Sequence, residues 1–173
     1  MAGPVIDVTE CTLQESEERY RSIFDCINDA VFVLEVETGA ILDVNQRACE
    51  LFGHSKEAMR QLSIAQLSAD VPPHTQKNVF RWMQRALQEG PQLFEWKARA
   101  RSGDIFWVEV NMRTALIQCG TRLVLTVRDI SKRKGIESEL RKSEERFRLI
   151  MGNSRDKNTK FITLFYYIYT EGS

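Results

Sequence analysis

The residue types that carry catalytic and metal chemistry are present, but their spacing forms no recognisable catalytic or metal-binding motif. The cysteines are scattered through the chain at four positions: Cys11, Cys26, Cys49 and Cys119. No two of them form a Cys-x-x-Cys pair, and the two histidines, His54 and His74, lie far apart in the sequence. This spacing indicates neither a disulfide framework nor a zinc site.

Enzymatic activity is equally unsupported. The sequence has no glycine-rich phosphate loop, no Ser, Cys or Lys nucleophile with a matched base in a local motif, and no pair of acids at a suggestive position. A histidine kinase would need a phosphoacceptor helix and an ATP-binding domain, for which 173 residues leave no room. We expect that the chain is not an enzyme and that any catalytic output domain lies outside it.

The composition is that of a folded domain without a strong preference for charged partners. Of the 173 residues, 43% are hydrophobic, and 24 Lys and Arg balance 24 Asp and Glu. This balance argues against nucleic acid or an anionic membrane as a partner. No apolar run reaches the ~20 residues that span a bilayer, and the N-terminus does not resemble a secretion signal, so we expect a cytoplasmic protein.

A short repeat divides the chain. Leu13 to Phe24 reads LQESEERYRSIF, and Leu140 to Met151 reads LRKSEERFRLIM. The repeat indicates a boundary between tandem domains, with two merely similar charged helices as the alternative. The similarity ends after Asp156, so residues 152–173 are interpreted as the truncated start of a second repeat or an aberrant tail.

The first half of the chain predicts a hairpin followed by short helices. Two β-branched runs, Ala30 to Val36 and Ala40 to Val44, are separated by a Glu-Thr-Gly turn. Asn45 is placed to cap a short helix from Gln46 to Phe52, which Gly53 can end in a left-handed conformation. Further short helical turns are expected before Pro72.

The second half predicts one long helix and three strands. Apolar residues recur at helical spacing from Thr75 to Glu89, and strict alternation follows in residues 94–101, 106–113 and 123–128. The predicted fold class is α+β: a five-stranded antiparallel sheet with helices on one face, flanked by N- and C-terminal helices.

The parity of these elements predicts an apolar cleft between the sheet and the long helix. Its candidate lining residues are Val79, Trp82, Met83, Phe94, Trp96, Phe106, Val108, Val110, Leu125 and Val127. Simple core packing is the alternative, because aromatic stripes at such spacings usually fill a domain interior. Any ligand is expected to be small and mostly apolar, since few polar groups converge there.

Several motifs together resemble the PAS family of sensory domains. They are Asp29-Ala-Val-Phe-Val-Leu, Gly39-Ala-Ile-Leu-Asp-Val-Asn45, Leu51-Phe-Gly-His-Ser-Lys-Glu-Ala-Met59, Gly103-Asp-Ile-Phe-Trp-Val-Glu-Val110 and Val127-Arg-Asp-Ile-Ser131. The resemblance covers about residues 16–131 in the family's order. It implies a PAS fold, a small-molecule or interaction cleft, and use as the input portion of a bacterial-type sensor histidine kinase or diguanylate cyclase.

The end of the resemblance marks a candidate signal relay at Asp129, Ile130 and Ser131. This segment is similar to the family's closing Asp-Ile-Thr, where the sheet passes into a signalling helix. Independently, the Ser131 hydroxyl is expected to accept from a first-turn amide of the helix that follows, and Asp129 places a negative charge beside the same helix end. A solvated strand end is the alternative for Asp129.

The residues argue against flavin and haem, the two cofactors that some members of the family bind. By strand alternation, the amide side chains that flavin-binding relatives direct at the ring correspond to Ala98, Val108 and Val127, all of which are apolar. Haem-binding relatives use a histidine on the long helix, whereas His74 precedes that helix and, like His54, is expected to face solvent. Flavin and haem are both disfavoured, and the cofactor is left unknown.

Apolar residues in the two flanking helices follow heptad-like spacing and predict a dimer seam. The seam residues are Leu13, Tyr20, Ile23, Ile136, Leu140, Phe147 and Ile150. We expect a homodimer, with a lone solvated helix as the alternative because two turns of contact are few for a coiled coil.

These observations predict four segments: an N-terminal tail and helix over 1–28, a PAS domain over 29–131, a signalling helix over 132–151 and the tail over 152–173. The expected function is a sensory module that relays ligand occupancy or dimer packing to the C-terminal helix of a signal-transduction protein. The alternatives are a dimerisation scaffold that senses nothing, and the truncated front of a histidine kinase or diguanylate cyclase.

Overall fold

The computed structural model describes the backbone of residues 8–117 and 120–153 and the side chains of residues 15–117 and 120–149. The chain divides into two compact units, Met1–Ser131 and Lys132–Ser173. The predictions for the side chains of Leu13 and Ile150 and for the tail from residue 154 lie outside the described residues.

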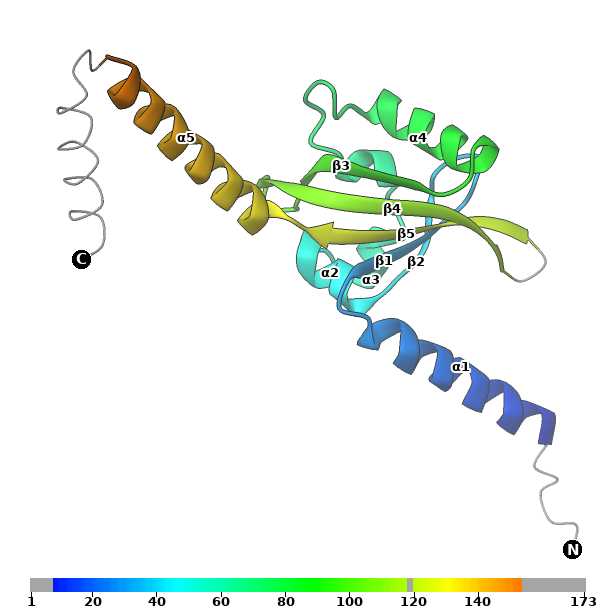
Figure 1. The fold of residues 1–173 in the computed structure, drawn as a ribbon. Coiled ribbons are helices and arrows are strands. Elements are labelled where there is room, and N and C mark those ends of the chain that lie inside the picture. The colour runs from blue at the N-terminus through cyan, green and yellow to red at the C-terminus, as the bar shows by residue number, and fades with distance from the viewer. Residues whose placement is uncertain (1–7, 118–119, 154–173) are drawn as a thin grey trace, which may run out of the picture. The chain divides into compact units, whose positions relative to one another are not determined.

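Helices and strands follow one another in the predicted order (Figure 1). They are α1 (Val8–Cys26), β1 (Ala30–Leu34), β2 (Ile41–Val44), α2 (Gln46–Phe52), α3 (Lys56–Met59), the 3-10 helix η1 (Ile64–Leu67), α4 (Gln76–Gln88), β3 (Gln92–Arg99), β4 (Ile105–Ile117), β5 (Gly120–Asp129) and α5 (Ser131–Asn153). None of the helices within the described segments is long and apolar enough to cross a membrane.

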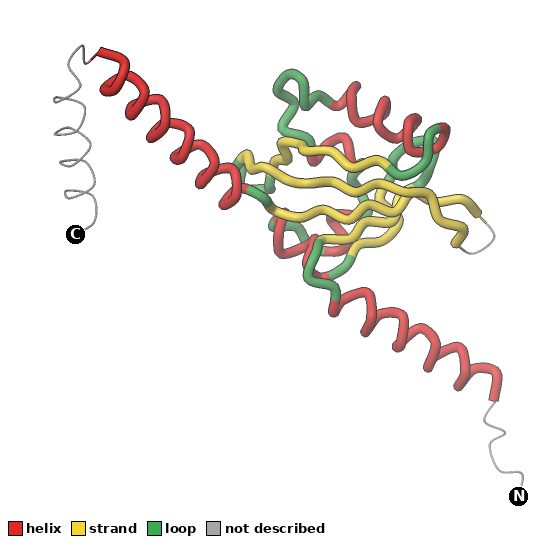
Figure 2. The backbone as a smooth tube through the Cα atoms, viewed as in Figure 1, coloured by secondary structure: helices red, strands yellow, loops and turns green. Residues whose placement is uncertain are grey.

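The five strands form one antiparallel sheet in the order β2-β1-β5-β4-β3, which confirms the predicted fold class (Figure 2). β1 pairs with β5, from Ala30 opposite Val127 to Leu34 opposite Leu123. β4 lies between β5 and β3, and its Val108 stands opposite Asp129 at the end of β5. Because β4 pairs with β5, it contacts both the sheet interior and the last residues before α5.

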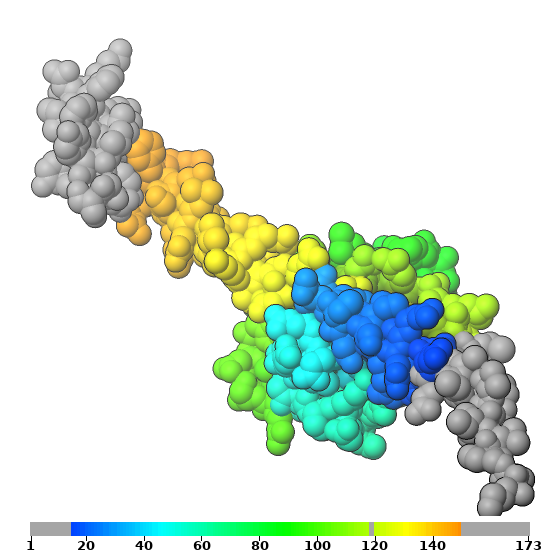
Figure 3. All heavy atoms as spheres, turned by 90° about the horizontal axis from the view of Figure 1, so that it is seen from below, coloured from blue at the N-terminus to red at the C-terminus, as the bar shows by residue number. Residues whose placement is uncertain are grey.

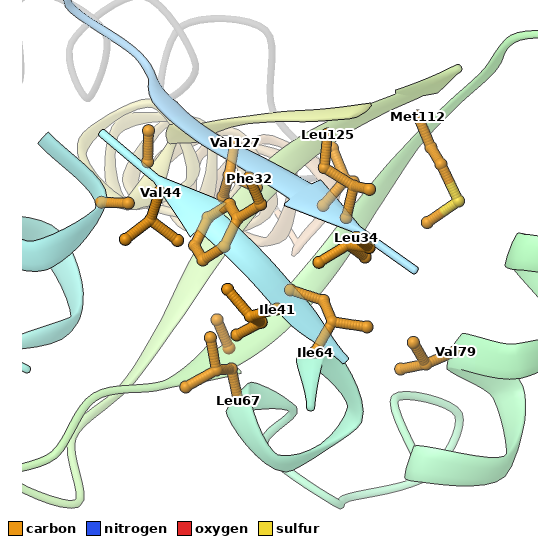
Figure 4. Packing of buried hydrophobic residues seen from close by; sticks show 14 of the residues in the cluster. Phe32, Leu34, Ile41, Val44, Ile64, Leu67, Val79, Met112, Leu125 and Val127 are labelled. Atoms are coloured by element: carbon orange, nitrogen blue, oxygen red, sulfur yellow. The ribbon is translucent and has the colours of Figure 1, made fainter. Parts of the chain in front are cut away.

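One face of the sheet carries the main hydrophobic core. In β4, the buried residues Val108, Val110 and Met112 alternate with more exposed neighbours, as the period of a strand requires. Figure 4 shows side chains of the sheet meeting those of η1 and α4, with Ile64 and Leu67 opposite the strands. Residues from α2, α3, η1 and α4 all join this cluster, so these four helices cover the face that the sequence predicts to be dry.

The opposite face carries a second, smaller cluster. Phe24 near the end of α1 packs on Val31 and Val33 of β1, whose side chains alternate with those of the main core. From below, the described part of α1 lies beside the segment that contains α2 and α3 (Figure 3). The N-terminal flanking helix is therefore anchored to the face away from α4.

Asn45 holds the corner where α1, β1 and α2 meet. Its Oδ1 accepts from the amides of Ala48 (3.0 Å) and Val31 (2.9 Å), so the predicted cap of α2 is confirmed. Its Nδ2 donates to the carbonyls of Phe24 (3.2 Å) and Asp29 (3.0 Å). The side chain is fully buried, and this burial is tolerated because its polar atoms are hydrogen-bonded to the backbone of all three elements.

Two glycines adopt the left-handed conformation that their positions require. Gly53 ends α2 with φ 71°, as predicted. Gly39, in the β1–β2 turn, has φ 68°, and a Cβ there would lie 3.2 Å from the side chain of Met83 on α4. The hairpin turn is thus packed directly under α4.

Candidate functional site

An apolar cavity lies between the sheet and its covering helices. Its volume is about 40 Å³. The lining residues come from α2, η1, α4 and three strands: Phe52, Ile64, Leu67, Ser68, Val79, Phe94, Trp96, Ala98, Val108, Val110, Met112, Leu125 and Val127. Since one water needs about 10–15 Å³ measured in this way, the cavity has room for only a few heavy atoms.

Ser68 provides the polar side-chain group of this lining. Its Oγ donates to the backbone carbonyl of His74 (2.7 Å) and accepts from Nε1 of Trp96 (3.1 Å). The hydroxyl is therefore engaged within the protein, although an oxygen of this type has a second lone pair. Such a lining suits a small apolar molecule that requires at most one hydrogen-bond acceptor.

Most of the residues predicted to line the cleft do line this cavity. They are Val79, Phe94, Trp96, Val108, Val110, Leu125 and Val127. The other three lie elsewhere: Trp82 stacks on the outer side of Phe94 at 4.1 Å, Met83 packs against the Gly39 turn, and Phe106 meets Phe52. Phe106 also lines an open groove of about 590 Å³ that includes Arg101 and Asp129.

Six lining residues were not among the predicted set. Met112 and Ala98 share the strand parity of predicted residues, so alternation alone could have identified them. The other four come from the short helices and the loop after them: Phe52, Ile64, Leu67 and Ser68. No periodicity identifies them, because their burial depends on how these short segments fold back on the sheet.

The start of α5 is fastened to β4 through Ser131. The Ser131 Oγ accepts from the amide of Trp107 (3.1 Å) and donates to its carbonyl (3.4 Å), while the amide of Ile130 donates to the same carbonyl (2.9 Å). The prediction that this hydroxyl caps the first turn of α5 is wrong. The hydroxyl bonds to the sheet instead, because the backbone amide and carbonyl of Trp107 offer it a donor and an acceptor.

Asp129 takes the capping role. Its Oδ1 accepts from the Ser131 amide at 2.8 Å, which satisfies a backbone donor at the helix start and puts a carboxylate at the positive end of α5. Ile130, between them, is only 3% exposed. Of the three predicted relay residues, Asp129 therefore caps the helix, Ile130 fills the core and Ser131 binds the backbone of Trp107.

An ion pair ties the end of β5 to the segment before β1. Arg128 donates from Nε and Nη2 to both carboxylate oxygens of Asp29, at 2.9 and 2.7 Å. These bonds hold the pKa of Asp29 below its ordinary 3.8. The residues that follow α1 and those that precede α5 are thus joined at one end of the sheet.

Trp107 and Val108 connect the cavity to the α5 junction. They are consecutive in β4: Val108 is buried and lines the cavity, whereas the backbone of Trp107 binds Ser131. The cavity lining and the contact with Ser131 are thus adjacent along β4.

The structure corrects the expectation for the two histidines. His74 is buried, with 9% of its surface exposed, because the loop before α4 folds back on the edge of β3. His54 is half-buried, and this burial lowers its pKa. Neither histidine lines the cavity.

The described seam residues are exposed. Their exposed fractions range from 36% to 60%. They are Tyr20 and Ile23 on α1 and Ile136, Leu140 and Phe147 on α5. Tyr20 stacks on Phe24 at 5.2 Å, so it also supports the anchor of α1.

Neither flavin nor haem fits the described cavity. Pockets for ligands of that size occupy about 300–1,000 Å³, far more than this cavity provides. Among the described side chains, no group of three His, Cys, Asp or Glu is placed to hold a metal. The lining of the cavity is an apolar surface with the Ser68 hydroxyl at its edge.

Comparisons with known proteins agree with this geometry. Residues 18–88 match a family model described as a PAS domain. The chain is 32% identical over 140 residues to the methyl sulfide methyltransferase-associated sensor of Methanosarcina acetivorans, covering 79% of this chain and 14% of that protein. It is 28% identical over 152 residues to sporulation kinase E of Bacillus subtilis, covering 88% and 20% respectively. The chain therefore spans a fifth or less of the length of these relatives.

Solved structures show the same fold. The PAS domain of an HTR-like protein from Haloarcula marismortui superposes with a TM-score of 0.62 at 24% identity, covering 70% of this chain and 98% of that one. A PAS domain from a two-component sensor histidine kinase gives a TM-score of 0.58 at 20% identity, covering 68% and 98%. At these identities the similarity concerns the fold alone.

Proposed function

Since the chain contains a PAS domain, we propose that it is the sensory input module of a cytoplasmic signal-transduction protein and that it relays cavity occupancy to α5. The proposal rests on the adjacency of Val108, which lines the cavity, and Trp107, whose backbone holds Ser131. Occupancy that shifts β4 changes the geometry of two hydrogen bonds at the helix start. The relay is then a local change in the stability of the first turn of α5.

The ligand is proposed to be small and apolar. The cavity volume limits it to a few heavy atoms, and the Ser68 hydroxyl offers it one acceptor position. A larger ligand would require α4 or the loop after η1 to move outward. No reacting group lines the cavity, so we propose binding without catalysis in this chain.

The output is proposed to lie in another domain, of the histidine kinase or diguanylate cyclase type. The support is the relationship to a kinase and to a sensor that are both much longer than this chain. The exposed apolar residues Tyr20, Ile23, Ile136 and Leu140 are proposed as the contact of a homodimer, which would place two output domains side by side.

Xenon tests the relay without knowledge of the natural ligand, because dry apolar cavities bind it. Amide chemical shifts of the purified chain would be followed under increasing xenon pressure. We expect saturable shifts at Val108 and Val110, accompanied by shifts at Trp107 and Ser131. The matched control is Ala98→Leu, which fills the cavity and should abolish the xenon-induced shifts both in the cavity and at the start of α5.

Two results would contradict the proposal. Xenon shifts confined to the cavity would show that occupancy is not transmitted, and unchanged spectra would show a packed interior. Native mass spectrometry of the same sample gives the oligomeric state. A dimer with an unresponsive interior would support the alternative of a scaffold that senses nothing.

A further inference from the structure

His74 contains a buried polar atom that no hydrogen bond satisfies. Its Nδ1 is inaccessible to solvent and has no partner among the described residues. Buried polar groups are nearly always paired, so an unpaired one requires a physical explanation. The ring contacts, rather than a hydrogen bond, hold this imidazole in place.

The ring lies between two tryptophans that belong to different parts of the proposed relay. Its centroid is 4.8 Å from the ring of Trp96 and 5.3 Å from that of Trp107, both in edge geometry. Trp96 lines the cavity and donates to Ser68, whereas the backbone of Trp107 binds Ser131. His74 therefore touches both the cavity wall and the residue that fastens α5.

The loop that carries His74 is attached to the edge of β3 by neutral hydrogen bonds and one cation. Ala69 donates to the carbonyl of Lys97 (3.0 Å), and Arg99 donates to the carbonyl of Ala69. Ser68 donates to the carbonyl of His74 itself (2.7 Å). These bonds position the imidazole but provide no carboxylate to stabilise a positive charge on it.

The charged groups on the same strand faces and in the loop include Glu95, Lys97 and Arg99 on β3, Glu109 on β4 and Asp70 in the loop. The Lys97 ammonium lies 5.0 Å from the ring centroid of Trp107 and acts on the imidazole electrostatically. Asp70 accepts from the amide of Gln76, and Glu109 lies on the same face of β4 as Trp107. Burial, and after it Lys97, lowers the pKa of His74 below 6.5.

We propose that His74 is a proton-sensitive latch that positions Trp107: the neutral ring holds the α5 junction closed, and a protonated ring leaves the sheet edge and loosens it. Protonation would leave an N–H at Nδ1 with no acceptor among the described residues and would put a positive charge beside Lys97. Release of the loop into water relieves both. The latch acts on the junction from the loop side and does not require a ligand in the cavity.

Proton linkage gives the size of the effect. A released histidine titrates near 6.5, so at pH 5.5 its protonated form exceeds its neutral form about tenfold. If the closed form remains neutral, the equilibrium constant for opening rises about tenfold between pH 7.5 and 5.5. This gain is present below 6.5 and is lost as the pH rises through that value.

The test is an NMR titration of the full chain that follows both histidine rings and the exchange of the amides of residues 131–136, corrected for intrinsic rates. We expect a midpoint for His74 below 6.5 and about a tenfold loss of amide protection at pH 5.5. His74→Phe keeps a ring that cannot be protonated, so its junction should stay protected at both pH values. His54→Gln, the matched control, should behave like the wild type.

His74→Ala removes the contact altogether and should loosen the junction at both pH values, while the sheet amides of β1 and β5 stay protected. The proposal is overturned if His74 titrates at or above 6.5. It is equally overturned if His74→Phe loses protection in acid as the wild type does, or if His74→Ala leaves residues 131–136 unchanged. None of these outcomes depends on xenon binding, so they are independent of the test of cavity occupancy.

Discussion

Replacement of Asn45 by alanine should destabilise the domain more than replacement of a less buried asparagine such as Asn78. The side chain is fully buried and joins α1, β1 and α2. Loss of the cap at Ala48 costs about 0.5–2 kcal/mol. Loss of the acceptor for the buried Val31 amide costs about 1–3 kcal/mol more. The expected total is about 1.5–5 kcal/mol.

Urea unfolding followed by circular dichroism measures this cost. With a slope of about 2 kcal/mol per molar, the midpoint should fall by about 0.8–2.5 M. The matched control is Asn78→Ala, because Asn78 is only half-buried and its side chain donates a hydrogen bond to the carbonyl of Pro73 (2.6 Å). The control should lose about 1 kcal/mol or less.

A midpoint for Asn45→Ala no lower than that of Asn78→Ala would refute the reasoning. Asn45→Ser covers the case in which the alanine variant does not fold, since a serine can still cap Ala48 but cannot reach the carbonyls of Phe24 and Asp29. Its midpoint should lie between the wild type and Asn45→Ala. Hydrogen exchange should also show weaker protection at the end of α1 in both variants.

Three further predictions concern the turn, the ion pair and the cap. Gly39→Ala should cost about 1–2 kcal/mol in urea unfolding, because φ is 68° and the new Cβ would press on Met83; no loss would contradict the packing of this turn. Asp29→Asn should be less stable than the wild type at neutral pH, and the difference should shrink as the pH falls below 3.8, because the pKa of Asp29 is lowered by Arg128; a constant difference would exclude this linkage. Asp129→Ala should lower amide protection in the first turn of α5 about 2- to 30-fold without unfolding the sheet; unchanged protection would show that the cap is dispensable.

Local signals predicted the secondary structure well. The alternation in residues 94–112 identified the buried side of β3 and β4, because a strand places every second side chain on one face. Asn45 and Gly53 identified both ends of α2, because capping depends on a residue and its near neighbours. The antiparallel five-stranded sheet followed from the succession of these elements, whereas the order of its strands was not predicted.

Non-local contacts explain what the sequence did not predict. The Ser131 hydroxyl at the start of α5 bonds to the backbone of Trp107 on β4, and the loop that carries His74 returns to the edge of β3. Neither partner is close in sequence to the residue that it binds. Phe52 and Ile64 reach the cavity from segments too short to show a period. For the same reason, the cavity lining was predicted from its strands and only partly from its helices.

The most direct test of the relay compares the wild type with Ser131→Ala under xenon, with hydrogen exchange of residues 131–136 as the measurement. Ser131→Ala removes the side chain that binds Trp107 but leaves the cavity lining intact. If β4 transmits occupancy through this contact, xenon changes the protection of these amides in the wild type and changes it less in Ser131→Ala, which keeps only the bond from the Ile130 amide to the Trp107 carbonyl. An equal change in both proteins, or no change in the wild type, would contradict the account.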